Sequence, residues 1–240
     1  MHDPKRRLDF PALLNARDLG GYPTVDGSTT RWRSLVRSDD LSQLTAAGLE
    51  ALASYGIETV IDLRWPDEVA EMPSPVQVLR HIRYEPFSLC TPTQAEWRAR
   101  RADATAKELW NRAMLQHLRE ELRQVLEIVA TASPGPLLFH CVAGKDRTGV
   151  IAALLLALAD VEPEAIAYDY AESFDNLLPG YLQRYSDAEP AAIIDALQCP
   201  AQGVHNMLAY LEEHGGARAY LEAIGMRPEH IALLRSRLRD

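Results

Sequence analysis

The stretch at residues 137–159, LLFHCVAGKDRTGVIAALLLALA, decides the fold of this chain. Its first five residues form a short apolar run typical of a buried strand, and GVIAALLLALA is apolar nearly all round, as in a buried helix. A strand, a loop and a helix in this order aim a helix N-terminus and a run of loop N–H groups at one point. Such a set of donors favours an anion.

The chemistry of this loop depends on a thiol and a guanidinium. Cys141 opens the loop, and five residues separate it from Arg147. Gly144 and Gly149 let the backbone turn tightly and approach a ligand. The positive field of the loop favours the Cys141 thiolate, and Arg147 offers a planar fork to two phosphoryl oxygens. We therefore predict in-line attack of the thiolate on phosphorus, a phosphocysteine intermediate and its hydrolysis by water.

The other residues of the loop are expected to bind and orient the phosphate. The side chains or backbone groups predicted to contact a substrate phosphate, or a free phosphate or sulfate anion, belong to His140, Val142, Ala143, Gly144, Lys145 and Asp62. Thr148 is expected to hydrogen-bond the sulfur and help it leave. His140 can also orient the loop through its ring nitrogens. No metal ion or cofactor is required, because the backbone and Arg147 supply the charge stabilisation.

A purely structural interpretation of the same residues makes Cys141 a small buried hydrophobe and Arg147 a helix cap. The complete pattern, Cys-x5-Arg-Thr-Gly placed between a strand and a helix, argues against it.

Composition predicts one globular domain spanning residues 1–240. The chain has 47% hydrophobic and 25% charged residues and a net charge of −9, so it lacks the global basic surface of a nucleic-acid-binding protein. Its three widely spaced cysteines fit a reducing compartment. The N-terminus has no apolar leader, and the apolar run at 150–159 is too short to span a bilayer. We expect a cytoplasmic protein with no integral membrane segment.

Hydrophobic periodicity and turn residues give the remaining elements. We expect a strand at residues 33–37, a helix over 41–56, strands at 59–61 and within 81–87, and helical structure over about 93–132. Pro66 begins a short helix, with Asp67 and Glu68 in its first turn. After residue 163 several helices follow, separated at 179–180, 200, 215–216 and 225. The simplest organisation is one α/β domain with a helical C-terminal half.

HCVAGKDRTG at residues 140–149 resembles the signature of the cysteine-dependent protein tyrosine phosphatase superfamily, and more narrowly its bacterial atypical members. The similarity extends to NARDLGGY (15–22), RSLVRSDDLSQLTAAG (33–48), VIDLR (60–64) and AYLEAIGM (219–226). It implies a central, mainly parallel sheet flanked by helices, and hydrolysis of phosphotyrosine, often with phosphoserine, phosphothreonine or phosphoinositide activity. It also makes Cys141 the nucleophile, Arg147 the phosphate clamp and Thr148 the leaving-group helper.

The same resemblance leaves the substrate open between a phosphoprotein and a phosphoinositide. Lys145 looks like the lysine that phosphoinositide phosphatases carry in this loop, although a solvated charge at the rim is the alternative. A phosphate-binding module without turnover is the third hypothesis. It is weakened because Cys141, Arg147 and Thr148 are all present.

Three aspartates compete to be the general acid that protonates the leaving group. Asp67 lies in WPD, which matches the mobile acid loop of many tyrosine phosphatases, but it directly follows a strand and suits the first turn of a helix. Asp62 ends that strand and could instead pair with Arg64. Asp146 lies inside the loop, and Leu89 stands where a bacterial relative has its aspartate. Asp146 is the preferred acid.

Helices inserted before the signature loop cover the active site in the relatives, so a helical lid is expected within 93–122. There Trp97, Arg98, Arg100 and Arg101 could touch an acidic substrate, although a solvated helix face is the preferred interpretation. Cys90 and Cys199 could protect Cys141 as resolving thiols, but buried structural roles are favoured for both.

Overall fold

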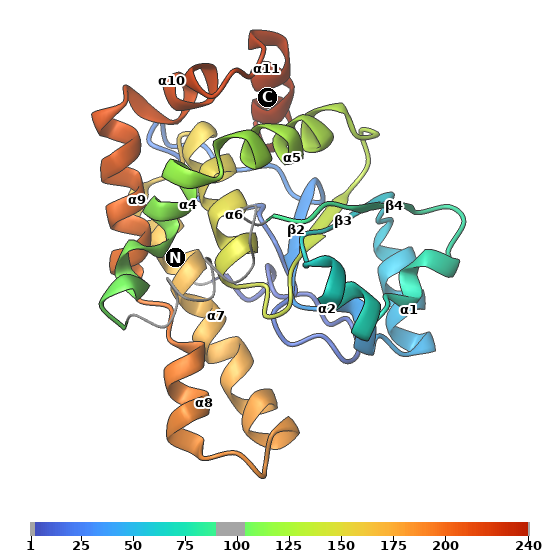
Figure 1. Ribbon diagram of the computed structural model, residues 1–240. Coiled ribbons are helices and arrows are strands. Elements are labelled where there is room, and N and C mark those ends of the chain that lie inside the picture. The colour runs from blue at the N-terminus through green and yellow to red at the C-terminus, as the bar shows by residue number, and fades with distance from the viewer. Residues whose placement is uncertain (1–2, 90–103, 240) are drawn as a thin grey trace.

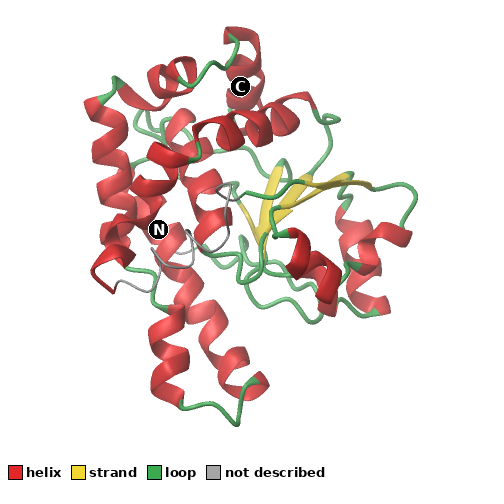
Figure 2. Ribbon diagram, in the orientation of Figure 1, coloured by secondary structure: helices red, strands yellow, loops and turns green. Residues whose placement is uncertain are grey.

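The structure, a computed structural model, describes residues 3–89 and 104–239, and a five-stranded sheet lies at its centre (Figures 1 and 2). The strand order is β1 (Arg17–Asp18), β2 (Leu35–Ser38), β5 (Leu137–His140), β3 (Thr59–Asp62) and β4 (Arg83–Pro86). β1 runs antiparallel to β2, whereas the other neighbours are parallel. The predicted α/β fold, with a mainly parallel sheet flanked by helices and a helical C-terminal half, is confirmed.

The strand order places the loop after β5 in the middle of the sheet. His140 at the end of β5 is paired with Ser38 of β2 on one side and with Asp62 of β3 on the other. The carboxyl ends of parallel strands form one edge, where ligands of α/β proteins bind. The loop that starts at Cys141 is therefore flanked by the segments that follow β2 and β3.

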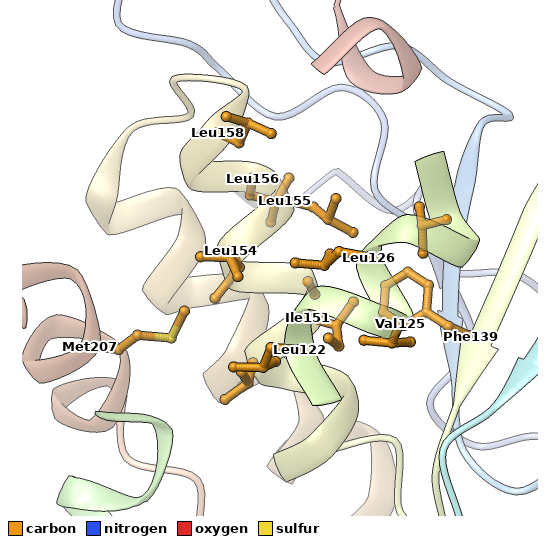
Figure 3. Close-up of a cluster of buried hydrophobic side chains, with 14 of the residues drawn as sticks. Leu122, Val125, Leu126, Phe139, Ile151, Leu154, Leu155, Leu156, Leu158 and Met207 are labelled. Carbon is orange, nitrogen blue, oxygen red and sulfur yellow. The ribbon is translucent and has the colours of Figure 1, made fainter. Parts of the chain in front are cut away.

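Side chains of the sheet alternate between two hydrophobic clusters, as the period of a strand requires. In β5, Leu137 and Phe139 belong to the larger cluster, and Leu138 belongs to a second cluster that includes residues of α1 (Ala46–Tyr55). The larger cluster packs α5 (Arg119–Thr131) and α6 (Asp146–Leu158) against one face (Figure 3).

Helix α6 is surrounded by other helices, which explains why its sequence is apolar on nearly every side. Its helix neighbours include α4 (Trp110–His117), α7 (Pro163–Arg184), α10 (Gly216–Ala223) and α11 (Pro228–Leu238). The predicted burial of this helix is confirmed, since all but two of its residues are buried (Asp146 and Ala157).

Several predicted boundaries are confirmed. Gly56 ends α1 in the left-handed conformation, with φ of 91°, and Pro66 begins α2 (Pro66–Glu71). Pro200 separates α8 (Pro190–Leu197) from α9 (Ala201–Glu213). Three short 3-10 helices complete the described elements: η1 (Leu41–Gln43), η2 (Pro75–Val78) and η3 (Ala104–Leu109). Within the described ranges, no helix combines the length and apolarity that crossing a bilayer requires.

The predicted helix break at residues 179–180 is wrong, because both residues lie inside α7. Gly180 serves packing rather than a turn: a Cβ at this position would lie 2.5 Å from Leu14 Cδ1. The chain leaves α7 only at Tyr185, and α8 returns beside it, so the two helices form a projecting pair (Figure 1).

Two other expectations need correction. The strand expected at 33–37 begins only at Leu35, because Arg33 has a left-handed φ of 56° that a strand cannot contain. The helical segment expected over 93–132 is interrupted at Leu118, with φ of −114° and ψ of 35°. The break lets both α4 and α5 direct apolar residues into the larger cluster. The part of that segment at 93–103 lies outside the described residues.

Candidate active site

The loop after β5 fits against the end of β2 only because residue 144 is glycine. Gly144 has φ of +62°, which favours glycine, and a Cβ there would lie 2.3 Å from the carbonyl oxygen of Ser38. Neither the backbone conformation nor the space allows another residue. This close approach fixes the loop against the sheet.

The loop carbonyls are held by groups outside the loop. His140 Nδ1 donates to Cys141 O (3.1 Å), and the Asp40 N–H donates to Val142 O (2.9 Å). Asn15 Nδ2 donates to Ala143 O (3.0 Å), and Arg37 Nη2 donates to Gly144 O (2.7 Å). By contrast, the backbone N–H groups of residues 142–145 donate to no acceptor among the described residues. This arrangement leaves a row of donors for an anion, as the sequence predicts.

A buried ionic cluster supports the groups that hold these carbonyls. Asp169 of α7 pairs with Arg37 and, at 2.8 Å, with Arg17 Nε, and it also accepts a hydrogen bond from Tyr22 at 2.8 Å. Burial alone would favour the neutral acid, but the two arginines outweigh it and hold the pKa of Asp169 well below its usual value. Residues of the motif NARDLGGY thus act behind the loop: Asn15 bonds the loop directly, and Arg17 and Tyr22 bond Asp169, the partner of Arg37.

Cys141 and Arg147 line one pocket of about 190 Å³. The loop contributes Cys141, Val142, Ala143, Lys145, Asp146 and Arg147, and the α2, α4, α7 and α8 segments contribute Trp65, Glu68, Trp110, Tyr181, Ala196 and Leu197. The thiol residue is only 3% exposed, so a substrate must enter this pocket to reach it. The predicted nucleophile and phosphate clamp are therefore brought together.

Arg147 is held by a carboxylate that the sequence reasoning did not select. Its Nη1 lies 2.7 Å from Glu68 Oε2, its Nη2 lies 3.2 Å from Glu68 Oε1, and the guanidinium carbon is 4.7 Å from the centre of the Trp65 ring. Burial opposes the charge of Arg147, but Cys141 and Glu68 outweigh that effect and raise its pKa. Glu68 follows the carboxyl end of β3, and that position was the available signal.

Lys145 and Asp146 occupy opposite sides of the same turn. Lys145 Nζ donates to the carbonyls of Ala196 (2.9 Å) and Gln198 (3.1 Å) at the C-terminal end of α8, and it lies 3.7 Å from Asp146 Oδ2. Asp146 Oδ1 accepts a hydrogen bond of 3.1 Å from Tyr170. Lys145 is thus a buried cation bonded to a helix end rather than a solvated charge at the rim.

Thr148 lies in the first turn of α6 and is fully buried. Within the described part of the chain, its hydroxyl has no hydrogen-bond partner. A buried hydroxyl in this condition is unusual, because native proteins satisfy most of their buried polar groups.

Asp62 and His140, which we expected near substrate, are not among the residues that line the pocket. Both are completely buried, and Asp62 Oδ2 lies 2.7 Å from Arg64 Nη2, 2.6 Å from the Tyr84 hydroxyl and 3.6 Å from His140 Nε2. Burial alone would raise the pKa of Asp62, but His140, Arg64 and Tyr84 lower it to about 2. A carboxylate ionised at neutral pH and removed from the pocket is not a general acid. Asp62 instead has a structural role, as the ion-pair partner of Arg64.

The ion pair of Asp62 predicts a pH-dependent loss of stability. The folded pKa is about 2, below the unfolded value of roughly 4, so its contribution is complete above pH ~4 and is lost as the pH falls toward ~2. In urea unfolding, wild type should exceed Asp62→Asn in stability at pH 6. This difference in the free energy of unfolding should shrink by about 2 kcal/mol as the pH is lowered from ~4 to ~2. A difference that stays constant with pH would contradict the assignment.

The position of Asp67 confirms the interpretation of WPD as the start of a helix. It is exposed in the first turn of α2, its carboxylate accepts from the Glu68 N–H at 3.0 Å, and it does not line the pocket. Its neighbour Glu68 is the residue that faces Arg147.

The region around the predicted lid is only partly described. Trp97, Arg98, Arg100, Arg101 and Cys90 lie outside the described residues, whereas Trp110 of α4 lines the pocket.

Cys199 is buried away from the pocket, with its Sγ 3.4 Å from Ala171 O, and burial raises its pKa to about 11. Such a thiol is a poor nucleophile, in line with the structural role preferred for it. Across residues 3–89 and 104–239, no group of three His, Cys, Asp or Glu side chains is arranged to hold a metal ion.

Comparison with known proteins gives consistent results. A sequence profile described as the tyrosine phosphatase family matches residues 8–240. The tyrosine-protein phosphatase of Nostoc commune is 33% identical over 224 residues, covering 85% of this chain and 74% of that protein. The triple specificity protein phosphatase PtpB of Mycobacterium tuberculosis is 31% identical over 196 residues, 70% of each chain. The solved structure of P. aeruginosa TpbA aligns over 69% of this chain and 86% of its own, with 17% identity and a TM-score of 0.31, a likeness too slight to support an argument.

Proposed function

This chain belongs to the tyrosine phosphatase family, and on that premise we propose that it hydrolyses phosphotyrosine and related phosphomonoesters through a phosphocysteine intermediate. The observation that carries the proposal is the shared pocket of Cys141 and Arg147, closed by a loop whose N–H groups at 142–145 remain available to an anion. A sulfur nucleophile, a cationic fork and a set of backbone donors meet there. This combination suits the transfer of a phosphoryl group.

In the first step, the Cys141 thiolate attacks phosphorus in line with the ester oxygen. A sulfur–phosphorus bond forms, the phosphorus–oxygen bond to the leaving group breaks, and Asp146 gives that oxygen a proton. The loop N–H groups and Arg147 stabilise the charge on the other three phosphoryl oxygens. Because these donors are held before substrate arrives, little reorganisation accompanies the reaction.

In the second step, water attacks the phosphocysteine. Asp146, now ionised, takes the proton from water, and the sulfur–phosphorus bond breaks to return the thiolate and release inorganic phosphate. The Thr148 hydroxyl is buried and lacks a partner among the residues described, so it is suited to hydrogen-bond the departing sulfur. This role is compatible with the position of Thr148 in the first turn of α6.

Three observations support Asp146 as the acid. It lines the pocket with Cys141, it keeps part of its carboxylate accessible (19% side-chain exposure), and Tyr170 holds one of its oxygens in place. Its two rivals are in the wrong places, since Asp62 is fully buried in an ion pair and Asp67 is exposed outside the pocket.

Asp146→Asn should slow the first step only when the leaving group needs a proton. We expect kcat/KM, which reports only the steps up to formation of the phosphocysteine, to fall roughly 100-fold or more on a phosphotyrosine peptide, in the range typical of a lost general acid. The loss should be several times smaller on p-nitrophenyl phosphate, whose leaving group departs as the anion. Asp67→Asn is the matched control and should behave as wild type on both substrates. Equal losses on the two substrates for Asp146→Asn would contradict its role as the acid.

The range of substrates is a separate part of the proposal. One relative of this chain is called a triple specificity protein phosphatase. The resemblance of the loop to phosphatases that often act on phosphoserine and phosphothreonine extends the proposal to these substrates beside phosphotyrosine. A phosphoinositide is the second candidate because Lys145 lines the pocket. Its ammonium, however, is already bonded to two carbonyls of the α8 end, which favours protein substrates.

One assay separates these substrates. Phosphate release is measured from phosphotyrosine, phosphoserine and phosphothreonine peptides and from phosphoinositide vesicles, with wild type and Cys141→Ser in parallel. We expect phosphotyrosine to give the highest kcat/KM, and a metal chelator to leave the activity intact. A higher kcat/KM on the vesicles than on the peptides would show that the preferred substrate is the lipid and not the protein.

We further propose that residues 1–240 work as one domain and that the described part of the predicted lid, residues 104–122, covers the pocket. The support for a cover is Trp110, which contributes its side chain to the pocket from the described end of that segment.

A further inference from the structure

A second cavity, of about 220 Å³, lies at the edge of the sheet opposite the candidate active site. Ser34, one of its lining residues, comes directly before β2, and its carbonyl accepts the N–H of Leu137, the first residue of β5. Because β2 and β5 are parallel, this cavity borders their amino ends, whereas the phosphate-binding loop follows the carboxyl end of β5. We call it the arginine cavity, because Arg31, Arg33 and Arg237 line it.

The lining of the arginine cavity is positive in a protein that is negative overall. The chain carries a net charge of −9, yet three guanidiniums meet here, and the described lining residues include no Asp or Glu. Ser34 and Ser236 add two hydroxyl groups that can donate hydrogen bonds. A concave surface lined by charge of one sign attracts ligands of the opposite sign.

Arg237 of α11 is a buried cation, only 7% exposed, and across the described ranges it forms an ion pair with no carboxylate. Burial lowers its pKa, and the charge of Glu58 opposes this effect only in part. Its hydrogen bonds go to main-chain carbonyls: Nε to Val129 (2.8 Å), Nη2 to Ala132 (2.8 Å) and Ser133 (2.7 Å), and Nη1 to Gly135 (3.3 Å). These bonds use four of the five guanidinium N–H groups, so one N–H of Nη1 is left for a ligand.

Arg33 and Arg31 add charge from the segment that leads into β2. The Arg33 guanidinium lies 4.5 Å from the centre of the Tyr55 ring and donates to the Tyr55 carbonyl, and Arg31 Nη1 donates to Ser236 O at 2.9 Å. Asp18 is bonded by the backbone N–H of Arg33, at 2.8 Å, and it does not line the cavity. The contacts of the Arg33 guanidinium are therefore with neutral groups, which leave its positive charge for an anion.

We propose that the arginine cavity binds a small oxyanion, of the size of phosphate or sulfate, at a site separate from the catalytic loop. Pockets for drug-sized ligands measure roughly 300 to 1,000 Å³, so the 220 Å³ here suit a smaller molecule. Guanidinium groups bind such oxyanions well, because their planar N–H donors match two oxygens. The anion would also supply the opposite charge that buried Arg237 lacks. This site needs neither Cys141 nor turnover, so it does not depend on the proposed function.

A competing explanation is that these arginines serve only the ends of two helices. α5 and α11 lie side by side (Figure 1), and Arg237 bonds the last turn of α5, whereas Arg31 bonds the last turn of α11. Cations at helix C-termini are stabilising without any ligand. In that case the carbonyls satisfy the arginines, and the cavity binds no anion.

Calorimetry with inorganic phosphate distinguishes the two explanations. The catalytic loop also binds phosphate, so the titration uses Arg147→Ala, which removes the phosphate clamp of that loop. We expect this variant still to bind phosphate at low ionic strength, less tightly as NaCl is added. Adding Arg33→Gln should weaken this binding roughly 10- to 100-fold, the range for losing a hydrogen bond to a charged group. In the wild-type chain, Arg33→Gln alone should remove one of two phosphate sites, so the test does not depend on the folding of Arg147→Ala.

Arg218→Gln is the matched control, because it removes the same charge from an exposed arginine of α10 that lies outside the cavity. It should leave phosphate affinity within about twofold, and Arg33→Gln should leave kcat/KM on p-nitrophenyl phosphate unchanged. Melting temperatures show which variants are folded, and Arg237→Lys provides a second change inside the cavity. Two results would overturn the proposal: a folded Arg147→Ala that binds no phosphate, or phosphate binding that neither Arg33→Gln nor Arg237→Lys weakens.

Discussion

Cys141→Ser should abolish turnover while the protein stays folded and still binds phosphate. We expect kcat to fall roughly 10⁴-fold or more, the scale seen when a catalytic nucleophile is removed. Serine is close to cysteine in size, so the loop with its N–H groups and Arg147 should keep its geometry. The serine hydroxyl stays un-ionised at neutral pH, however. The positive field of the loop is strong enough to favour a thiolate but not strong enough to form the alkoxide.

The measurement pairs turnover with binding. Phosphate release is followed on a phosphotyrosine peptide, and phosphate binding is measured by calorimetry on both proteins. Acid-quenched wild type should carry a phosphoryl group during turnover, and Cys141→Ser should carry none. Cys199→Ser is the matched control, because it removes a buried thiol outside the pocket and should retain the activity. Substantial turnover by Cys141→Ser would contradict the cysteine mechanism.

Arg147→Lys should reduce kcat/KM by roughly 1000-fold although the charge is kept. Removing one preorganised donor from an anion site typically costs 10²- to 10³-fold, and this change removes a fork. The ammonium of lysine is a single point with no planar edge, so it cannot hold Glu68 and two phosphoryl oxygens together. It also loses the contact between the guanidinium and the Trp65 ring.

The expected loss should appear both in kcat and in phosphate affinity, and it should be the same for good and poor leaving groups. Arg218→Lys is the control, since Arg218 is an exposed arginine of α10 that pairs with Glu222. Circular dichroism and the melting temperature report whether Arg147→Lys remains folded. A kcat/KM within about tenfold of wild type would contradict the view that the fork, rather than the charge alone, binds the phosphoryl group.

The site depends on parts of the chain that are far apart in sequence. Asn15 and Arg37 hold carbonyls of the loop, and Asp169 of α7 neutralises Arg37 from behind. Removing the Asp169 carboxylate would take from buried Arg37 its carboxylate partner and leave Arg17 only the more distant Glu172, at 3.8 Å, which should destabilise the protein strongly. The order of the loop therefore rests on a buried cluster that also joins α7 to the sheet.

Sequence reasoning failed where a decision depended on packing. At residues 179–180, the proline and glycine suggested a turn, but α7 continues and the glycine makes room for Leu14. Asp62 occupies the correct edge of the sheet, yet Arg64 and Tyr84 enclose it and remove it from the pocket. Lys145 does line the pocket, as expected of a residue that contacts substrate, but its ammonium is also bonded to the end of α8. In each case a partner from another segment set the role.

The sequence by itself determined the strand, the phosphate-binding loop and the helix at 137–159, together with the placement of Cys141 and Arg147 in one pocket. These features are local: alternation and apolarity define the elements, and five intervening residues in one turn bring the two side chains together. Only the tertiary structure decided which carboxylate meets Arg147. Glu68 is 79 residues away, and it reaches the arginine because parallel pairing places β3 beside β5, so that both strands end at the same edge.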